Sequence, residues 1–116
     1  MPAPSTKPSR EIPAAENVRV QELANYQDGA VVSRTLLHRA AGTVTLFAFD
    51  EEQGLSEHTA PFDAIAHILE GTAEITISGK PLTVGAGEMV LMPAGQPHAL
   101  RAATKFKMLL TMIGSS

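Results

Sequence analysis

The strongest constraint on the fold is a regular succession of short apolar runs, each followed by turn-forming residues. The segment AEITIS at 73–78 alternates apolar and polar side chains, so Ala73, Ile75 and Ile77 share one face of an extended chain. Other runs rich in Val, Ile, Thr and Phe recur at intervals of about 8 to 12 residues, separated by Gly, Pro or Asp. We therefore expect an all-β domain of about nine to eleven short strands, with at most one helical turn in residues 15–26.

The length of the chain sets the domain organisation. With 116 residues, the protein is the size of one domain with one core. Residues 1–16 contain four prolines, which fix φ and lack an amide donor. We expect residues 1–16 to form a flexible arm and residues 17–116 to form a barrel domain. An alternative for the arm is that it lies on a partner subunit.

Charge and composition exclude several classes of partner. The net charge is -3 and no basic run is present, so we expect no nucleic acid partner. The absence of cysteine excludes disulfides and thiolate metal sites. No apolar run approaches the roughly 20 residues of a membrane span, so we expect no membrane partner. Because the N-terminus has no apolar signal core, we expect a cytoplasmic protein.

The segment from Gly87 to His98 contains glycine, proline and histidine at fixed intervals. Gly87 is followed by EMVLM, then by the turn Pro93-Ala94-Gly95, then by Gln-Pro and His98. This order resembles the second motif of the cupin family. The resemblance implies an antiparallel double-stranded β-helix barrel, also described as a jelly roll, with His98 at its mouth. The chain also looks like small single-domain cupins of unassigned function, for which the resemblance implies a homodimer.

The first cupin motif is present only in part. Counted back from Gly71, its His-x-His positions fall on His58 and Ala60, and its Glu position falls on Ala64. The Asn that often closes the second motif falls on Ala102. A cupin metal site typically has three His and one carboxylate, so the resemblance leaves His58 and His98 as the two matching ligands.

His58 and His98 are our candidate metal ligands, and the metal would be a divalent ion such as Fe, Mn, Ni or Zn. Strand alternation turns Asp63 and His67 away from the barrel interior, so neither completes the set. Two alternatives stay open: hydrogen bonds to backbone or water without a metal, and general-base chemistry by one imidazole.

The alanines at the missing ligand positions also leave space. An apolar pocket with two polar anchors is typical of a small-ligand site, so His58, Phe62 and His98 are our candidate ligand contacts. The alternative is that larger side chains such as Met92 or Met108 fill this space.

Two segments have apolar side chains on both faces. Ile65, His67 and Leu69 face outward from their strand, and residues 106–113 are apolar on both sides. An apolar outer face favours contact with a second subunit, so we expect a homodimer whose interface includes His67.

Three functions follow from these observations. The first is a small-molecule-binding cupin barrel with a degenerate metal site at its mouth. The second is a mononuclear metal-dependent dioxygenase or isomerase that uses the incomplete two-His set. The third is a dimeric scaffold without a ligand. The sequence leaves open whether the protein is an enzyme, because this barrel supports many chemistries.

Overall fold

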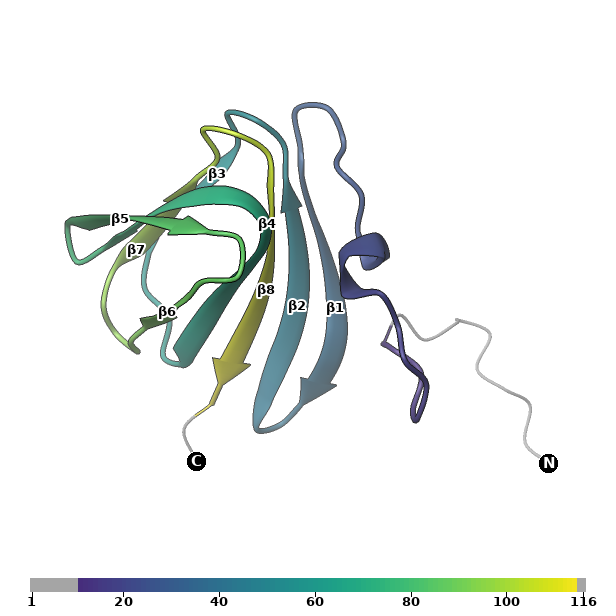
Figure 1. The fold of residues 1–116 in the computed structure, drawn as a ribbon. Coiled ribbons are helices and arrows are strands. Elements are labelled where there is room, and N and C mark those ends of the chain that lie inside the picture. The colour runs from purple at the N-terminus through teal and green to yellow at the C-terminus, as the bar shows by residue number, and fades with distance from the viewer. Residues whose placement is uncertain (1–10, 115–116) are drawn as a thin grey trace.

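The computed structural model describes residues 11–114, which form an antiparallel β-barrel (Figure 1). A single 3-10 turn, η1 (Val20–Leu23), precedes the strands. The strands among these residues are β1 (Val31–Arg39), β2 (Gly42–Phe49), β3 (Gly54–His58), β4 (Asp63–Ile77), β5 (Lys80–Gly85), β6 (Met89–Met92), β7 (His98–Arg101) and β8 (Phe106–Ile113). In this part of the chain, no helix has the length and apolar character needed to cross a bilayer.

The long strand β4 belongs to two sheets and holds them together. Its first half pairs with β6 and β8 in a sheet that continues through β2 to β1. Its second half pairs with β5 and β7, and β7 pairs in turn with β3. The expected number of nine to eleven strands was too high, in part because residues 63–77 form one continuous strand where the apolar runs at 63–70 and 72–78 suggest two.

Gly71 permits the passage of β4 from one sheet to the other. The register against β8 shifts between Ile68 and Glu70, and Gly71 follows with φ of +76°. A Cβ atom at this position would overlap the carbonyl oxygen of Lys105 and lie 2.8 Å from the Cα of Phe106. Only glycine combines this left-handed conformation with such a close approach of another backbone.

The core lies between the two sheets and is built by strand alternation. Ala64, Ala66 and Ile68 on β4 are buried, whereas the residues between them are half-buried, which confirms the predicted alternation. On β8 the inward side chains include Phe106, whose ring stacks on that of Phe49 with centroids 4.3 Å apart. Such ring pairs add stabilisation beyond the burial of their apolar surface.

The segment around η1 packs on the outside of the five-stranded sheet. Ala24 is buried there with Leu46 and Ala48 in a second apolar cluster. The amine of Lys107 donates a hydrogen bond to the carbonyl oxygen of Gln21 and lies 5.1 Å from the ring centroid of Tyr26. These contacts fix the segment to the sheet through one charged and several apolar groups.

Part of the predicted arm contacts β1. The amide of Ile12 donates to the carbonyl oxygen of Leu36, and the carboxylate of Glu11 accepts from the amide of His38 and pairs with Arg39. The hydrogen bonds to His38 and Arg39 hold the pKa of Glu11 below its usual value. Residues 1–10 of the predicted arm lie outside the described residues.

Candidate functional site

Strands β3 and β7 place His58 and His98 opposite each other. His58 is the last residue of β3, and His98 is the first residue of β7, directly after the turn that contains Pro93 and Gly95. The two histidines are paired across the β3–β7 ladder, and His98 also pairs with Ile77 on β4. Because directly opposite residues of an antiparallel pair project to the same side, the register brings the two imidazoles together.

The two rings meet through their Nε2 atoms. These atoms lie 3.1 Å apart, and the rings are inclined by 69°. The other ring nitrogen of each histidine faces a backbone carbonyl: Nδ1 of His58 lies 2.8 Å from the oxygen of Ser56, and Nδ1 of His98 lies 3.3 Å from that of Gln96. A carbonyl only accepts, so both Nδ1 atoms must carry a proton for these hydrogen bonds to form.

This arrangement would allow the pair to hold a cation. If both rings are neutral with protonated Nδ1 atoms, two lone pairs of Nε2 face each other. A hydrogen bond between the Nε2 atoms of His58 and His98 needs one further proton, which leaves one ring as an imidazolium. A metal ion can replace that proton, because it also accepts both lone pairs.

The two rings differ in their exposure to solvent. His98 is 6% exposed, whereas His58 is exposed. Burial lowers the pKa of His98, and repulsion by a charge on His58 lowers it further, while the hydrogen bond to Gln96 acts in the opposite direction. Burial and the neighbouring imidazole therefore both disfavour a proton on Nε2 of His98.

The spacing of the donor atoms fits a metal ion held by two imidazoles. With metal–nitrogen distances of about 2.0–2.1 Å, two neighbouring ligands are separated by about 2.9 Å at a right angle and by about 3.3 Å in a tetrahedron. The observed separation of 3.1 Å lies between these values. The bonds from Nδ1 to backbone carbonyls supply the orienting outer contacts that metal-bound histidines usually have.

The residues that the structure describes supply two imidazoles to this site and no third ligand. Within residues 11–114, no group of three or more His, Asp or Glu side chains is close enough to hold a metal ion together. Asp63 accepts a hydrogen bond from the amide of Ala94, and the side chain of Gln96 accepts one from Ser78. Water or a bound molecule would have to fill the remaining positions around an ion.

Two alanines of β4, including Ala64 at the Glu position of the first motif, lie in a core cluster that contains methionines. Ala64 is 4% exposed and pairs with Met92 on one side and Met112 on the other. Ala66 is fully buried in the same core cluster, which also contains Met108. Flexible methionine side chains suit such gaps. This packing matches the alternative in which methionines occupy the space left by the smaller residues.

Phe62 lies in a pocket that is separate from His58 and His98. That pocket has a volume of about 250 Å³ and includes His38, Arg39 and Met112. The ring of Phe62 lies against Gly114, whose amide is bonded to the carbonyl oxygen of Ala41. The loop before β4 thus turns Phe62 toward the β1–β2 turn and the end of β8.

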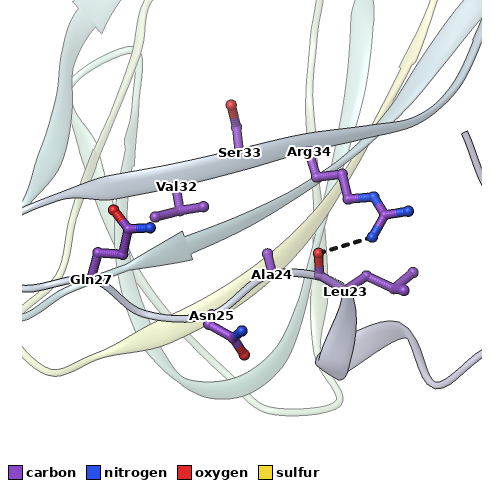
Figure 2. Close-up of a pocket in the computed structure, with 7 residues that line it drawn as sticks. All are labelled: Leu23, Ala24, Asn25, Gln27, Val32, Ser33 and Arg34. Carbon is purple, nitrogen blue, oxygen red and sulfur yellow. Dashed lines mark hydrogen bonds between the residues drawn. The ribbon is translucent and has the colours of Figure 1, made fainter. Parts of the chain in front are cut away.

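A larger pocket lies beside η1, where the sequence indicated no site. It has a volume of about 350 Å³ and lies between the η1 segment and β1, with Arg34 bonded to the carbonyl oxygen of Leu23 (Figure 2). Figure 2 shows Ser33 pointing away from Ala24, as strand alternation requires. The lining residues are Leu23, Ala24, Asn25, Gln27, Val32, Ser33 and Arg34. None of them is an imidazole, carboxylate or thiol.

Sequence reasoning missed the two carbonyl groups that orient the imidazoles. Ser56 and Gln96 each precede their histidine by two residues and contribute backbone atoms. A backbone oxygen has no signature in residue identity. Only the equal spacing of two positions before His58 and before His98 hints at a shared arrangement.

Comparison with known proteins agrees with this architecture. Residues 45–114 match the cupin domain family. The conserved protein SPY1581 of unknown function from Streptococcus pyogenes is 34% identical, with a TM-score of 0.87 over 97% of this chain and 99% of that one. A cupin superfamily protein from Desulfitobacterium hafniense is 24% identical, with a TM-score of 0.84 over 90% of this chain and 96% of that one.

A third solved structure belongs to a longer chain. The cupin 2 conserved barrel domain protein from Leptotrichia buccalis is 35% identical, with a TM-score of 0.78 over 80% of this chain and 45% of that one. Among curated proteins, no significant match was found. The matched domain spans β8, most of β2 and both histidine strands. The chain therefore belongs to the cupin family.

Proposed function

We propose that the protein is a small-molecule-binding cupin whose recognition element is the pair His58–His98. The observation that carries the proposal is the convergence of the two Nε2 atoms at 3.1 Å, with both rings oriented by backbone carbonyls. A pair that can hold a cation between its rings is suited to bind an anion beside that cation. The ligand class we propose is a small carboxylate.

The cation in this proposal is a divalent first-row metal held by His58 and His98. Bound there, the metal would act as a Lewis acid toward an oxygen donor of the ligand. The chain's own groups orient the site: the carbonyls of Ser56 and Gln96 keep both Nδ1 atoms protonated and both Nε2 lone pairs directed at one point. The exposed edge of His58 is the side from which a ligand can approach.

The test is metal binding to the full-length protein after treatment with a chelator. Titration with Zn²⁺ or Ni²⁺ in a calorimeter should give one ion per chain for the wild type. His58→Ala should weaken binding by about tenfold or more, because each imidazole contributes one of two protein ligands. His67→Ala is the matched control and should leave the affinity unchanged, because His67 lies on β4 and faces away from the core.

A second titration tests the carboxylate. Malonate should bind to the metal-loaded wild type more tightly than to the chelated protein or to His58→Ala. Equal metal affinities for the wild type and His58→Ala would contradict the metal site. Metal binding without any effect on malonate would contradict the proposed ligand class alone.

A second candidate function is a dimeric scaffold without a ligand. The pairing of Ala64 with Met92 on one side and Met112 on the other favours it, because methionines then lie beside the space that the smaller residue leaves. The same titrations separate the two candidates: a scaffold binds neither the metal nor malonate.

A further inference from the structure

The pocket beside Phe62 has a floor that strand register builds. His38 on β1 pairs with Thr43 on β2, and Thr43 pairs with Met112 on β8. Directly paired residues project from the same face of a sheet, so these three side chains form one row. Met112 pairs in turn with Ala64, which is 4% exposed, so the row lies on the face that carries the core. We call the space lined by this row and by Phe62 the Phe62 pocket.

Phe62 gives the pocket an aromatic wall from outside the sheet. It lies in the loop between β3 and β4 and is 37% exposed, whereas Phe49 and Phe106 are fully buried in the core. Gly114, which has no side chain, lies against its ring. The pocket has a volume of about 250 Å³, somewhat below the range of about 300–1,000 Å³ typical of drug-sized ligands. It therefore suits a ligand with a single ring.

His38 supplies a polar group that the protein does not use for its own hydrogen bonds. Its backbone amide donates to the carboxylate of Glu11, and its carbonyl oxygen accepts from Arg39. Within residues 11–114, neither nitrogen of its ring forms a hydrogen bond. Thr43 adds a hydroxyl to the same row. A neutral imidazole and a hydroxyl can each donate and accept, so together they suit a ligand group that does both.

The balance of charge favours a neutral ligand over an anion. Arg39 lines the pocket but forms an ion pair with Glu11 at 3.1 Å, so its positive charge is already opposed. Among the other described residues that line the pocket, none has a permanent charge. Moving a carboxylate out of water costs far more than moving a hydroxyl, unless an unopposed positive charge compensates. A hydroxyl is therefore the better match.

We propose that the Phe62 pocket is a second binding site, which takes a small neutral aromatic ring with one hydroxyl group, the phenol class. The ring packs against Phe62 and the thioether of Met112, both of which make favourable contacts with aromatic rings. The hydroxyl forms hydrogen bonds with His38 and Thr43. The pocket shares no lining residue with the imidazole pair, so this site does not rest on the proposed function.

Calorimetric titration of the chelated, full-length protein with para-cresol tests the proposal. We expect one site per chain with a dissociation constant of about 1 mM or below, which a ligand of this size can reach. His58→Ala should give the same value, which separates this site from the metal site. Amide NMR signals that move should belong mainly to residues 38–43, 62 and 112–114. The anion para-toluate, of similar size, should bind at least about fivefold more weakly.

Phe62→Ala tests the aromatic wall. It should weaken the binding of para-cresol by about tenfold or more, because the ligand loses a ring partner and apolar contact. Phe62→Leu keeps apolar bulk and should give an intermediate affinity. Phe62 is partly exposed, so both variants should fold. Leu91→Ala, at a 56% exposed apolar residue outside the pocket, is the matched control and should bind as the wild type does.

His38→Leu separates the hydroxyl from the ring. It should weaken the binding of para-cresol by about fivefold or more, since one hydrogen bond is lost, and it should not weaken the binding of toluene, which has no hydroxyl. His67→Leu removes an imidazole that faces away from the core and should change neither affinity. Failure of para-cresol to saturate the wild type, unchanged affinity in Phe62→Ala, tighter binding of para-toluate than of para-cresol, or equal losses for para-cresol and toluene in His38→Leu would each overturn the proposal.

Discussion

The Nε2 atom of His98 lies 3.1 Å from the Nε2 atom of His58, and neither ring can turn away without breaking a contact of its Nδ1 atom with a backbone carbonyl. The pair is therefore oriented before any ligand arrives. Orientation of this kind lowers the entropy lost on binding, which is a general route to affinity with few contacts.

The first prediction concerns the protonation of these rings. Nitrogen-detected NMR of the histidines above neutral pH should show the Nδ1-protonated tautomer for both His58 and His98, because carbonyl oxygens accept from both Nδ1 atoms. Isolated neutral histidine favours a proton on Nε2, so exposed His38 provides the internal comparison. Finding Nε2 protonated and Nδ1 bare in both rings would contradict the account of the site.

The second prediction concerns stability and pH. The folded protein holds the pKa of His98 below 6.5, so near that pH the unfolded chain binds more protons than the folded one. The free energy of unfolding should fall as pH drops from about 6.5 through the lowered folded pKa, and this contribution is fully present above the unfolded value. Thermal unfolding at a series of pH values measures the effect.

His58→Gln is the informative variant for this pH dependence. It removes the charge whose repulsion lowers the pKa of His98, so the pH dependence should become shallower, although burial still contributes. His67→Gln serves as the control. Parallel curves for the wild type and His58→Gln would exclude electrostatic coupling between the two imidazoles.

The third prediction concerns the attachment of the η1 segment. Lys107 is 7% exposed, donates to the carbonyl oxygen of Gln21 and lies beside the ring of Tyr26. Lys107→Met should lower the free energy of unfolding by about 1–3 kcal/mol, since it removes a charged hydrogen bond from a buried position. Hydrogen exchange should also speed up in residues 20–26.

Lys105→Met is the matched comparison for Lys107→Met. Lys105 also lies near the ring of Tyr26, at 5.4 Å, but its side chain is 53% exposed and its ion pair with Asp50 is long, at 4.0 Å. Its replacement should cost less than about 0.5 kcal/mol. An equal loss for the two lysines would mean that the buried bond to Gln21 contributes nothing specific.

The fourth prediction concerns Gly71. A methyl group there meets the backbone of Lys105 and Phe106, so Gly71→Ala should cost about 3 kcal/mol or more, from the left-handed conformation and the overlap together. Gly79 has a similar φ of +80° but open space around it. Gly79→Ala should cost about 1–2 kcal/mol from conformation alone. Denaturant unfolding of both variants separates the two contributions, and equal losses would show that the close approach is unimportant.

The sequence predicted the buried face of one strand and the position of His98 at the start of another. The alternation in AEITIS predicted a strand with one buried face, and Ala73 and Ile75 are fully buried. The spacing of the second motif predicted that His98 begins a strand after a turn, as it does. These features depend on local periodicity and turn chemistry, which residue identity records directly.

Features that depend on tertiary contact were harder to predict. Phe62 follows His58 by four residues, yet it packs against Gly114, because the loop between β3 and β4 reverses the chain. The position of Met92 beside Ala64 depends on a pairing between β4 and β6 that no local pattern specifies. The orientation of the imidazoles depends on backbone oxygens, which every residue has.

Strand β4 has one more consequence, for the order in which the barrel assembles. It pairs with β5, β6, β7 and β8, and these pairings are divided between the two sheets. Neither sheet can complete its hydrogen bonds until β4 is in place. We therefore expect that neither sheet folds independently of the other. We expect a single cooperative unfolding transition and slow refolding, because partners distant along the chain must meet before either sheet is complete.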